Sequence, residues 1–239
     1  MDSSQRPGPL HRMFTAVPPR YDLVNHAITL GLDNRWRRLA ARACLQAKPQ
    51  RVLDLGCGTG DLSVSLALAA EPGIEITGLD YSRAMLKLAR EKTTRAGVGK
   101  TVNVIHGEAT SLPFPDEYFD CVGISFAFRN LTYKNRVMLP HLYEVLRVLK
   151  PGGRYVIVES SQPGNRAIRT LFHLYLHAFV APIGSLLSGQ RQAYYYLAES
   201  ASRFYCPEEI REILYKRGFR EIDYRPLLLG AAGIHIATK

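Results

Sequence analysis

Cysteine is scarce in this chain, and the few cysteines present are far apart. Cys44, Cys57, Cys121 and Cys206 show no C-x-x-C spacing. Because zinc sites and disulfide frameworks both need cysteines at characteristic spacings, the sequence indicates neither a metal centre nor a disulfide-stapled fold. Cys57 falls in a predicted loop and Cys121 in a predicted buried strand, which fits a reducing compartment.

Acidic residues are also few relative to basic ones. The chain has 21 Asp and Glu against 31 Lys and Arg, which gives a net charge of +10. This excess favours a polyanionic partner, either nucleic acid or an anionic membrane surface, and charge alone does not choose between them.

Long hydrophobic runs are missing as well. No signal peptide, internal repeat or low-complexity tract is visible. The most apolar stretch, 171–187, is short for a membrane span, and Pro182 is expected to break it. The length of 239 residues and the 46% hydrophobic content predict one globular domain over 13–239, preceded by a polar, proline-rich and disordered segment at 1–12.

The segment 51–81 organises the rest of the chain. Its pattern predicts a buried parallel strand at 52–55, a helix from residue 61 and a second buried strand at 74–79. Between the first strand and the helix lie Gly56, Gly58 and Gly60. The unit therefore has a glycine-rich loop at the carboxyl end of its first strand, where open α/β sheets bind ligands.

The charges around this loop narrow the ligand. A dinucleotide site would read G-x-G-x-x-G, whereas this loop reads G-x-G-x-G and is flanked by Asp54 and Asp61, which would repel a pyrophosphate. Asp80, at the end of the second strand, is placed to accept from both hydroxyls of a ribose. A cationic adenosine ligand without phosphate is S-adenosylmethionine (SAM). The alternative is an ordinary strand-turn-helix with incidental glycines.

The segment DLGCGTG at 54–60 resembles the first motif of class I SAM-dependent methyltransferases. Nearly the whole chain after the first ten residues resembles one branch of them, the ubiquinone/menaquinone C-methyltransferases. The N-terminal block MF…YD…N…G…WRR and the FRN at 128–130 are the most specific parts of this match. The residues that carry it are Met13, Phe14, Tyr21, Asp22, Leu23, Asn25, Gly31, Trp36, Arg37, Arg38, 112–114, Phe119, Asp120, Ser125, Phe126, Arg129, Asn130, 147–153, Tyr196, Leu197, Ser200, Gly218 and Phe219.

The resemblance implies a doubly wound, mostly parallel, seven-stranded sheet with helices on both faces, and SAM as the cofactor. Glu108 would accept from the adenine amino group, with a plain loop charge as the alternative, and residues 112–114 would form an apolar wall beside the adenine. The cofactor-binding residues implied are Asp54, Gly56, Gly58, Thr59, Gly60, Asp80, Tyr81, Glu108, Ala109 and Ser125.

The N-terminal block at 13–48 is predicted to form two helical pieces separated by Gly31. In the family this block covers the cofactor and lines the substrate pocket, so Tyr21, Asp22 and Asn25 are site candidates. His26 is either a base or an isolated surface histidine. The second helix, at 34–46, has a basic face that is either solvated or in contact with lipid headgroups, formed by Arg35, Arg37, Arg38 and Arg42.

Residues 161–206 are an insertion before the last helix and the final hairpin, which is predicted at 219–224 and 228–237. The apolar stretch and a cluster of aromatic residues favour a lid or an interfacial segment that meets a flat ring or an isoprenoid tail. The alternative is a plain packed helical subdomain. Pro140 lies inside another helical pattern, at 134–149, and either kinks that helix or begins a shorter one.

By resemblance, the reaction is C-methylation of a polyprenyl benzoquinol or naphthoquinol. A ring carbon becomes nucleophilic when an adjacent hydroxyl loses its proton, so a cation or a base must lie near that oxygen. Arg129 is the candidate partner of the phenolate, Asn130 the candidate for a hydrogen bond to the ring oxygen, and Tyr21 or Asp22 the candidate for orientation.

Two rival functions stay open at this point. One is an RNA methyltransferase of the same fold, and the other is a SAM-binding subunit of a quinone-synthesis complex that has lost turnover. The expected partners are the quinol and an anionic membrane surface, with no nucleic acid and with a homodimer or a quinone-synthesis complex left open. The expected location is the cytoplasm, at the inner face of the membrane.

Overall fold

The computed structural model describes residues 21–239, except for the side chain of Tyr21. The predicted disorder at 1–12, the motif residues Met13 and Phe14, and the orienting role of the Tyr21 side chain therefore lie outside the described residues.

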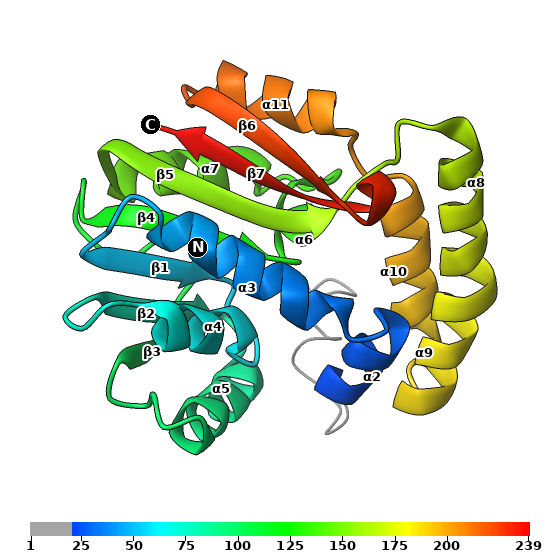
Figure 1. Ribbon diagram of the computed structural model, residues 1–239, viewed down its shortest axis with the longest axis horizontal. Coiled ribbons are helices and arrows are strands. Elements are labelled where there is room, and N and C mark those ends of the chain that lie inside the picture. Colours follow the sequence, from blue (N-terminus) through cyan, green and yellow to red (C-terminus); the bar gives the residue numbers. More distant parts are fainter. Residues whose placement is uncertain (1–20) are drawn as a thin grey trace, which may run out of the picture.

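The described residues form one seven-stranded sheet in the order β3-β2-β1-β4-β5-β7-β6 (Figure 1). The first five strands are parallel, and β7 is antiparallel to both of its neighbours. The predicted doubly wound, mostly parallel sheet is confirmed. The strands are β1 Arg51–Leu55, β2 Glu75–Asp80, β3 Val102–His106, β4 Phe119–Ser125, β5 Leu149–Ser160, β6 Arg220–Leu227 and β7 Ala232–Thr238.

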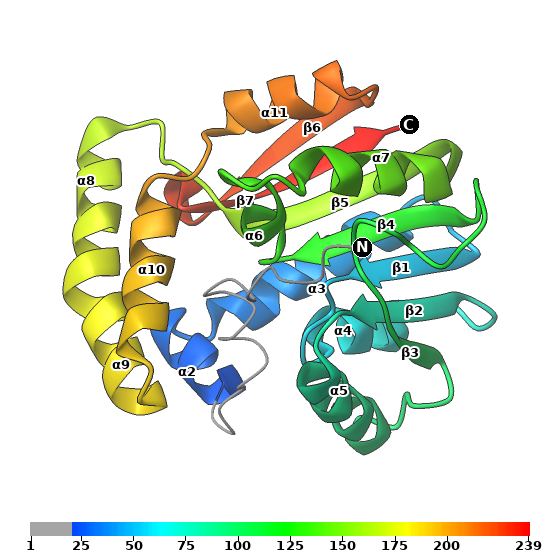
Figure 2. The same cartoon turned by 180° about the vertical axis from the view of Figure 1, so that it is seen from behind.

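Helices cover both faces of this sheet, as its apolar central strands require. Figure 1 shows α3 and α4 on the near face, and Figure 2 shows α6 and α7 on the opposite one. The helices are α2 Tyr21–Ile28, α3 Leu32–Leu45, α4 Asp61–Ala69, α5 Arg83–Arg95, α6 Phe128–Thr132, α7 Met138–Val148, α8 Arg166–Tyr175, α9 Ala181–Ser188, α10 Arg191–Ser202 and α11 Pro207–Lys216, with a π-helical turn η1 at Leu176–Val180 and a 3-10 turn η2 at Leu228–Gly230.

The core is divided between the two faces of the sheet. On one face Trp36, Leu62 and Leu66 of α3 and α4 pack on the strands, and on the other Val145 of α7 and Leu214 of α11 do so. A third cluster lies away from the sheet and joins α2 to the insertion. It contains Val24, Ile28, Leu176, Val180, Ala181, Tyr194, Ala198 and Ala201.

The insertion forms an antiparallel helical pair, with α8, η1 and α9 in one continuous run and α10 returning beside it (Figure 1). The expected break at Pro182 is wrong. The N–H of Ala181 donates to the Leu176 carbonyl in an i to i−5 bond, and this wider turn accommodates the proline that follows. Within residues 21–239, the run Arg166–Ser188 is the one helix long and apolar enough to cross a membrane.

Other boundaries differ from the predictions for local reasons. Helix α7 begins at Met138, so Pro140 lies in its first turn, where the missing N–H costs no hydrogen bond. Leu228 and Leu229 were predicted to begin the last strand, but both have positive φ, of 44° and 55°, and form the turn of the final hairpin.

Candidate active site

A cavity of about 1060 Å³ opens at the carboxyl ends of β1, β2, β4 and β5. Its polar end is formed by the glycine-rich loop and the strand ends, and its apolar end by the inner side of the insertion. The volume is at the upper end of the range for ligand sites and suits two ligands side by side.

The backbone of the glycine-rich loop has the conformation that the sequence predicted. Gly56, Gly58 and Gly60 have φ values of 66°, 53° and 87°, which residues with a side chain rarely adopt. A Cβ on Gly56 would lie 3.0 Å from that of Ala127, and one on Gly60 would lie 3.2 Å from that of Ala89. Beside Gly58, by contrast, no atom of residues 21–239 other than its own chain neighbours lies within 4 Å of such a Cβ, so a ligand can approach its backbone.

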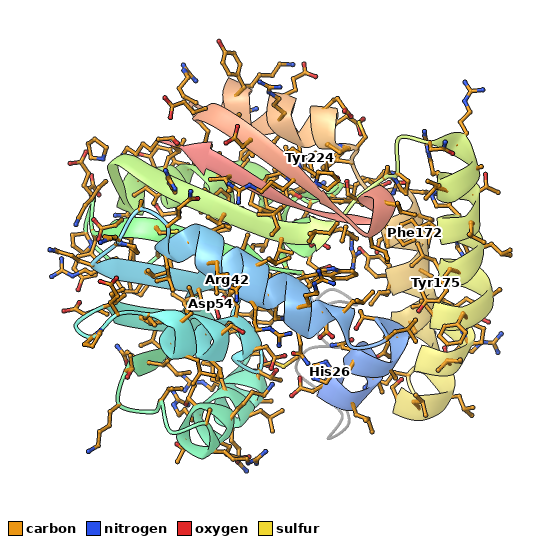
Figure 3. The ribbon with its side chains drawn as sticks, viewed as in Figure 1. His26, Arg42, Asp54, Phe172, Tyr175 and Tyr224 are labelled. Atoms are coloured by element: carbon orange, nitrogen blue, oxygen red, sulfur yellow. The ribbon has the colours of Figure 1, made fainter. Side chains whose placement is uncertain are left out.

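Asp54 is a fully buried carboxylate in the cavity wall (Figure 3). Its Oδ2 accepts from the Ser63 hydroxyl at 2.5 Å, whereas its Oδ1 has no hydrogen-bond partner among the described residues. Burial raises the pKa of this carboxyl to about 7, although Ser63 and Arg37 oppose the shift. An under-satisfied carboxylate of this kind suits a cationic group nearby.

Asp80 is held by the backbone on both sides of the cavity floor. Its Oδ2 accepts from the Gly58 N–H at 2.9 Å and its Oδ1 from the Ser82 N–H at 2.8 Å. Burial raises the pKa of Asp80, while these two backbone donors oppose the rise. Each oxygen keeps a further lone pair, so the carboxylate is oriented and still able to accept from a ribose.

The residues present therefore fit SAM. Two buried carboxylates, an open glycine backbone and a cavity at the strand ends suit a cationic adenosine ligand. The expected effect of Asp61 needs correction: its carboxylate pairs with Lys92 and lies 3.6 Å from the Arg37 guanidinium, so it is not a free anion. Asp54 and Asp80 remain as the buried carboxylates that would repel a pyrophosphate.

Helix α2 is attached to the glycine-rich loop through Asp22. Its Oδ1 accepts from the Thr59 hydroxyl at 2.7 Å, and its Oδ2 lies 2.7 Å from Lys92 Nζ, which also donates to Thr59. Asp22 is not among the cavity-lining residues, whereas Asn25 is. We therefore propose that Asp22 positions α2 over the loop.

Helix α3 adds a second connection, through the buried Asp33. This carboxylate accepts from Thr29 at 2.8 Å, pairs with Arg37, and lies 2.8 Å from Nδ1 of His26. Burial opposes the ionisation of Asp33, but Arg37 and Thr29 outweigh it and lower its pKa. His26 is thus a partner of Asp33 and not an isolated surface residue.

Arg37 is also set apart from the other arginines of its helix. Its Nε donates to the Ser125 hydroxyl at 3.2 Å, and its guanidinium lies over the Phe126 ring, 5.4 Å from the centroid. Arg37 and Ser125 line the cavity, as does Phe126, which has a φ of 55°. The exposed basic face of α3 is therefore limited to Arg35, Arg38 and Arg42.

Arg129 and Asn130 both line the cavity, on the short helix α6. Arg129 is buried, and its guanidinium donates to the Ser160 hydroxyl at 2.8 Å. It lies 3.8 Å from Glu159, whose other oxygen accepts from the Arg129 N–H at 3.0 Å. The Nε of Arg129 is buried and has no hydrogen-bond partner among the described residues.

Tyr81, Glu108 and Ala109 lie in the cavity wall, on the loops after β2 and β3. The Glu108 side chain is exposed. The predicted adenine wall at 112–114 is wrong, because Leu112 and Phe114 pack in the core and Pro113 does not line the cavity. Phe114 is held there by Phe119, edge to face at 4.7 Å.

The apolar end of the cavity comes mainly from the insertion, whose Phe172 and Tyr175 on α8 are labelled in Figure 3. The Tyr175 hydroxyl donates to the Ile28 carbonyl at 2.6 Å, which closes the insertion against α2. Leu228 and Leu229 complete this end, and they were missed in the sequence because their apolar pattern predicts a strand. Among residues 21–239, no group of three or more His, Cys, Asp or Glu is arranged to hold a metal ion.

Solved structures resemble this fold. A SAM dependent methyltransferase from Aquifex aeolicus superposes with a TM-score of 0.56 and 22% identity, over 79% of this chain and 81% of that one. The mitomycin 7-O-methyltransferase MmcR superposes with a TM-score of 0.67 and 19% identity, over 95% of this chain and 60% of that one. These likenesses support the class I methyltransferase fold.

Sequence relatives are closer. The demethylmenaquinone methyltransferase of Thermus thermophilus is 39% identical over 95% of this chain and 100% of its own length. The ubiquinone/menaquinone biosynthesis C-methyltransferase UbiE of Geobacter sulfurreducens is 36% identical over 95% of this chain and 87% of its own. The pattern of the ubiE/COQ5 methyltransferase family matches residues 2–239. The predicted family and cofactor are thereby confirmed, and the chain belongs to the ubiE/COQ5 methyltransferase family and is a SAM-dependent methyltransferase.

Proposed function

We propose that this chain methylates a ring carbon of a polyprenyl quinol, either demethylmenaquinol or a demethylated ubiquinol precursor. The observation that carries the proposal is the continuous cavity, which runs from Asp54 and Asp80 past Arg129 to the apolar insertion. A cationic cofactor, a ring hydroxyl and an isoprenoid tail would meet these three regions in that order. The names of the relatives describe the same chemistry.

Bound SAM would supply a methyl group on a positively charged sulfur, and the ring carbon would attack this methyl group in line with the bond to sulfur. Asp54, Gly58 and Asp80 would hold it, and Arg129 and Asn130 would face the quinol. The Arg129 guanidinium stabilises the negative charge that grows on the ring oxygen, in a buried site where such a contact is strong. Asn130 orients the same oxygen, and the insertion excludes water.

Purified protein incubated with methyl-labelled SAM, demethylated quinol lipids and total RNA tests this function. We expect the label in the quinone lipid fraction. Label in RNA would support a nucleic-acid methyltransferase, and SAM binding without any labelled product would support a non-catalytic subunit.

Asp80→Ala should weaken SAM by at least about tenfold. Two hydrogen bonds from the ribose to a carboxylate contribute about 1.5–3 kcal/mol, and the Gly58 N–H would lose its acceptor as well. Isothermal titration calorimetry measures the change, with the exposed Asp223→Ala as control. Wild-type affinity in Asp80→Ala would refute the assignment.

SAM affinity should rise with pH between about 6 and 8. The pKa of Asp54 is raised to about 7, so the carboxyl is largely protonated below that pH and must release its proton to pair with the sulfonium. S-adenosylhomocysteine, which lacks the positive sulfur, should bind with little such dependence, and Asp54→Asn should abolish it. Equal pH slopes for the two ligands would show that Asp54 does not sense the sulfonium.

Arg129→Ala should bind SAM as the wild type does and lose most of its turnover. The charge that Arg129 opposes develops mainly in the transition state, so kcat carries the loss. Arg129→Lys should recover only part of it, because an ammonium cannot reproduce the planar fork. Loss of SAM affinity in proportion to rate would instead make Arg129 a cofactor-binding or structural residue.

We further propose that the protein works in the cytoplasm at the inner face of the membrane. A polyprenyl quinol is insoluble in water, and the insertion and the final hairpin turn expose a set of leucines, namely Leu171, Leu174, Leu186, Leu187, Leu228 and Leu229. Exposed Arg166 and Arg191 flank this set, and the net charge is +10. Apolar insertion and electrostatic attraction together make a reversible anchor.

The double variant Leu174→Ser/Leu186→Ser should bind anionic liposomes more weakly than the wild type. It should also turn over a long-tailed quinol more slowly, with a smaller loss on a tail-less quinol. These side chains are 60% and 83% exposed and do not line the cavity, so their loss leaves the site intact. Leu68→Ser, at 67% exposure on α4, is the matched control. Liposome co-sedimentation of the wild type should also weaken with salt. Equal losses on both substrates would mean that this leucine surface takes no part in collecting the isoprenoid tail.

A further inference from the structure

Ser160 and Glu159 lie at the carboxyl end of β5, beside the proposed quinol site. Ser160 lines the cavity, whereas Glu159 does not line it and is only 2% exposed. Neither residue belongs to the motifs that identify the family in this sequence. A carboxylate this well buried needs partners, and the partners found here have an unusual arrangement.

The Ser160 hydroxyl stands between the buried carboxylate and the cavity. Its Oγ donates to Glu159 Oε1 at 2.9 Å and accepts from the Arg129 guanidinium at 2.8 Å. The guanidinium itself lies 3.8 Å from Glu159 Oε1, beyond hydrogen-bond distance. Arginine–carboxylate pairs in direct contact are frequently bidentate. Here the hydroxyl of a cavity-lining residue bridges the two charges instead.

We propose that Ser160 and Glu159 form a proton relay, in which Glu159 takes the proton of the quinol hydroxyl through Ser160. This inference depends on the proposed function and adds the base that the reaction needs. One lone pair of Ser160 Oγ is used by Arg129, which leaves the other to accept from the ring hydroxyl. Arg129 then stays beside the ring oxygen as its negative charge grows.

The proton and electron balance closes without another reactant. The ring O–H bond breaks as its proton passes to Ser160, and the Ser160 proton passes to Glu159. The electron pair left on the ring oxygen makes the ring carbon nucleophilic, and that carbon bonds to the methyl group while the sulfur keeps the electrons of the broken S–C bond. The carbon then loses its hydrogen to water as a proton, and Glu159 returns its proton to the ring oxygen. One proton is released per methyl group transferred.

Among the described residues, few other groups on this face can titrate. Glu208 of α11 interacts with Tyr224 and His235, and hydrogen bonding lowers its pKa, so it stays charged above pH 6. Arg129 is the charged side chain paired with Glu159, and Gly233 is its neighbour on β7. Tyr224 and His235 lie on the same side of the final hairpin, with their rings 4.7 Å apart. Burial raises the pKa of Tyr224 and lowers that of His235 to about 4, so both stay neutral between pH 6 and 9 and neither produces a pH effect in that range.

Single-turnover methylation by the preformed SAM complex, measured anaerobically with a short-tailed demethylated quinol, tests the relay. The wild-type rate should change little between pH 7 and 9. Ser160→Ala should be slower by about 100-fold or more at pH 7, which is the usual contribution of a positioned base. Its rate should then rise steeply with pH, because hydroxide must remove the proton. A chlorinated ring with a more acidic hydroxyl should shrink the defect.

The controls separate this relay from folding and from the function itself. The Kd for SAM and the thermal unfolding midpoint of Ser160→Ala should match the wild type. Ser161→Ala, the buried neighbour that does not line the cavity, should keep the wild-type rate and pH profile. Glu159→Gln should show the same pH dependence as Ser160→Ala.

Two results would overturn the relay. Ser160→Ala at the full wild-type rate would remove it directly. If Ser160→Ala lowers the rate by the same factor at every pH, and with both the unsubstituted and the chlorinated quinol, Ser160 only orients Arg129. Failure of the wild type to methylate any quinol would contradict the proposed function instead, so the two failures are distinguishable.

Discussion

The hydrogen bond from the Gly58 N–H to the Asp80 carboxylate is the contact on which the site depends. It joins the loop after β1 to the end of β2, and so fixes a backbone with positive φ values against a neighbouring strand. The two backbone donors offset the cost of burying Asp80. They also hold the carboxylate in one orientation, so the direction of its remaining lone pairs is fixed. If Asp80 binds the ribose as proposed, the sheet sets the position of the ribose, because the carboxylate is fixed by backbone donors.

Asp54 illustrates the opposite use of burial. It has one hydroxyl donor and one oxygen without a partner in the described part of the chain, so its charge is poorly compensated. Burial makes its ionisation unfavourable and raises its pKa. In the proposed function, a cationic cofactor would remove that cost. Asp80 would then supply orientation and Asp54 electrostatic preference, although both are aspartates at the ends of adjacent strands.

Much of the fold follows from sequence because each element is determined locally. The buried run of β1, the glycines after it and the Ser82 side chain, which accepts from the Met85 N–H at the start of α5, all act over a few residues. The errors arose where side-chain packing or an irregular turn overrides the sequence pattern. Residues 112–114 turned into the core because Phe114 meets Phe119, and the helix at Pro182 continues because a π-turn precedes it. Arg37 belongs to the WRR block, but its partner Asp33 and the Ser160–Glu159 pair lie outside the motifs. Their contacts depend on side chains that other elements bring to the site.

Helix α2 joins the polar end of the cavity to its apolar end. Its polar side carries Asp22, which contacts Thr59 of the glycine-rich loop and Lys92 of α5. Its apolar side carries Val24 and Ile28, which pack among the insertion residues, and the Tyr175 hydroxyl adds a hydrogen bond to the Ile28 carbonyl. These eight residues therefore contact both the loop region and the insertion. An outward movement of α2 would break the Asp22–Lys92 ion pair and the apolar cluster together, so the contacts of this helix couple the two ends of the cavity.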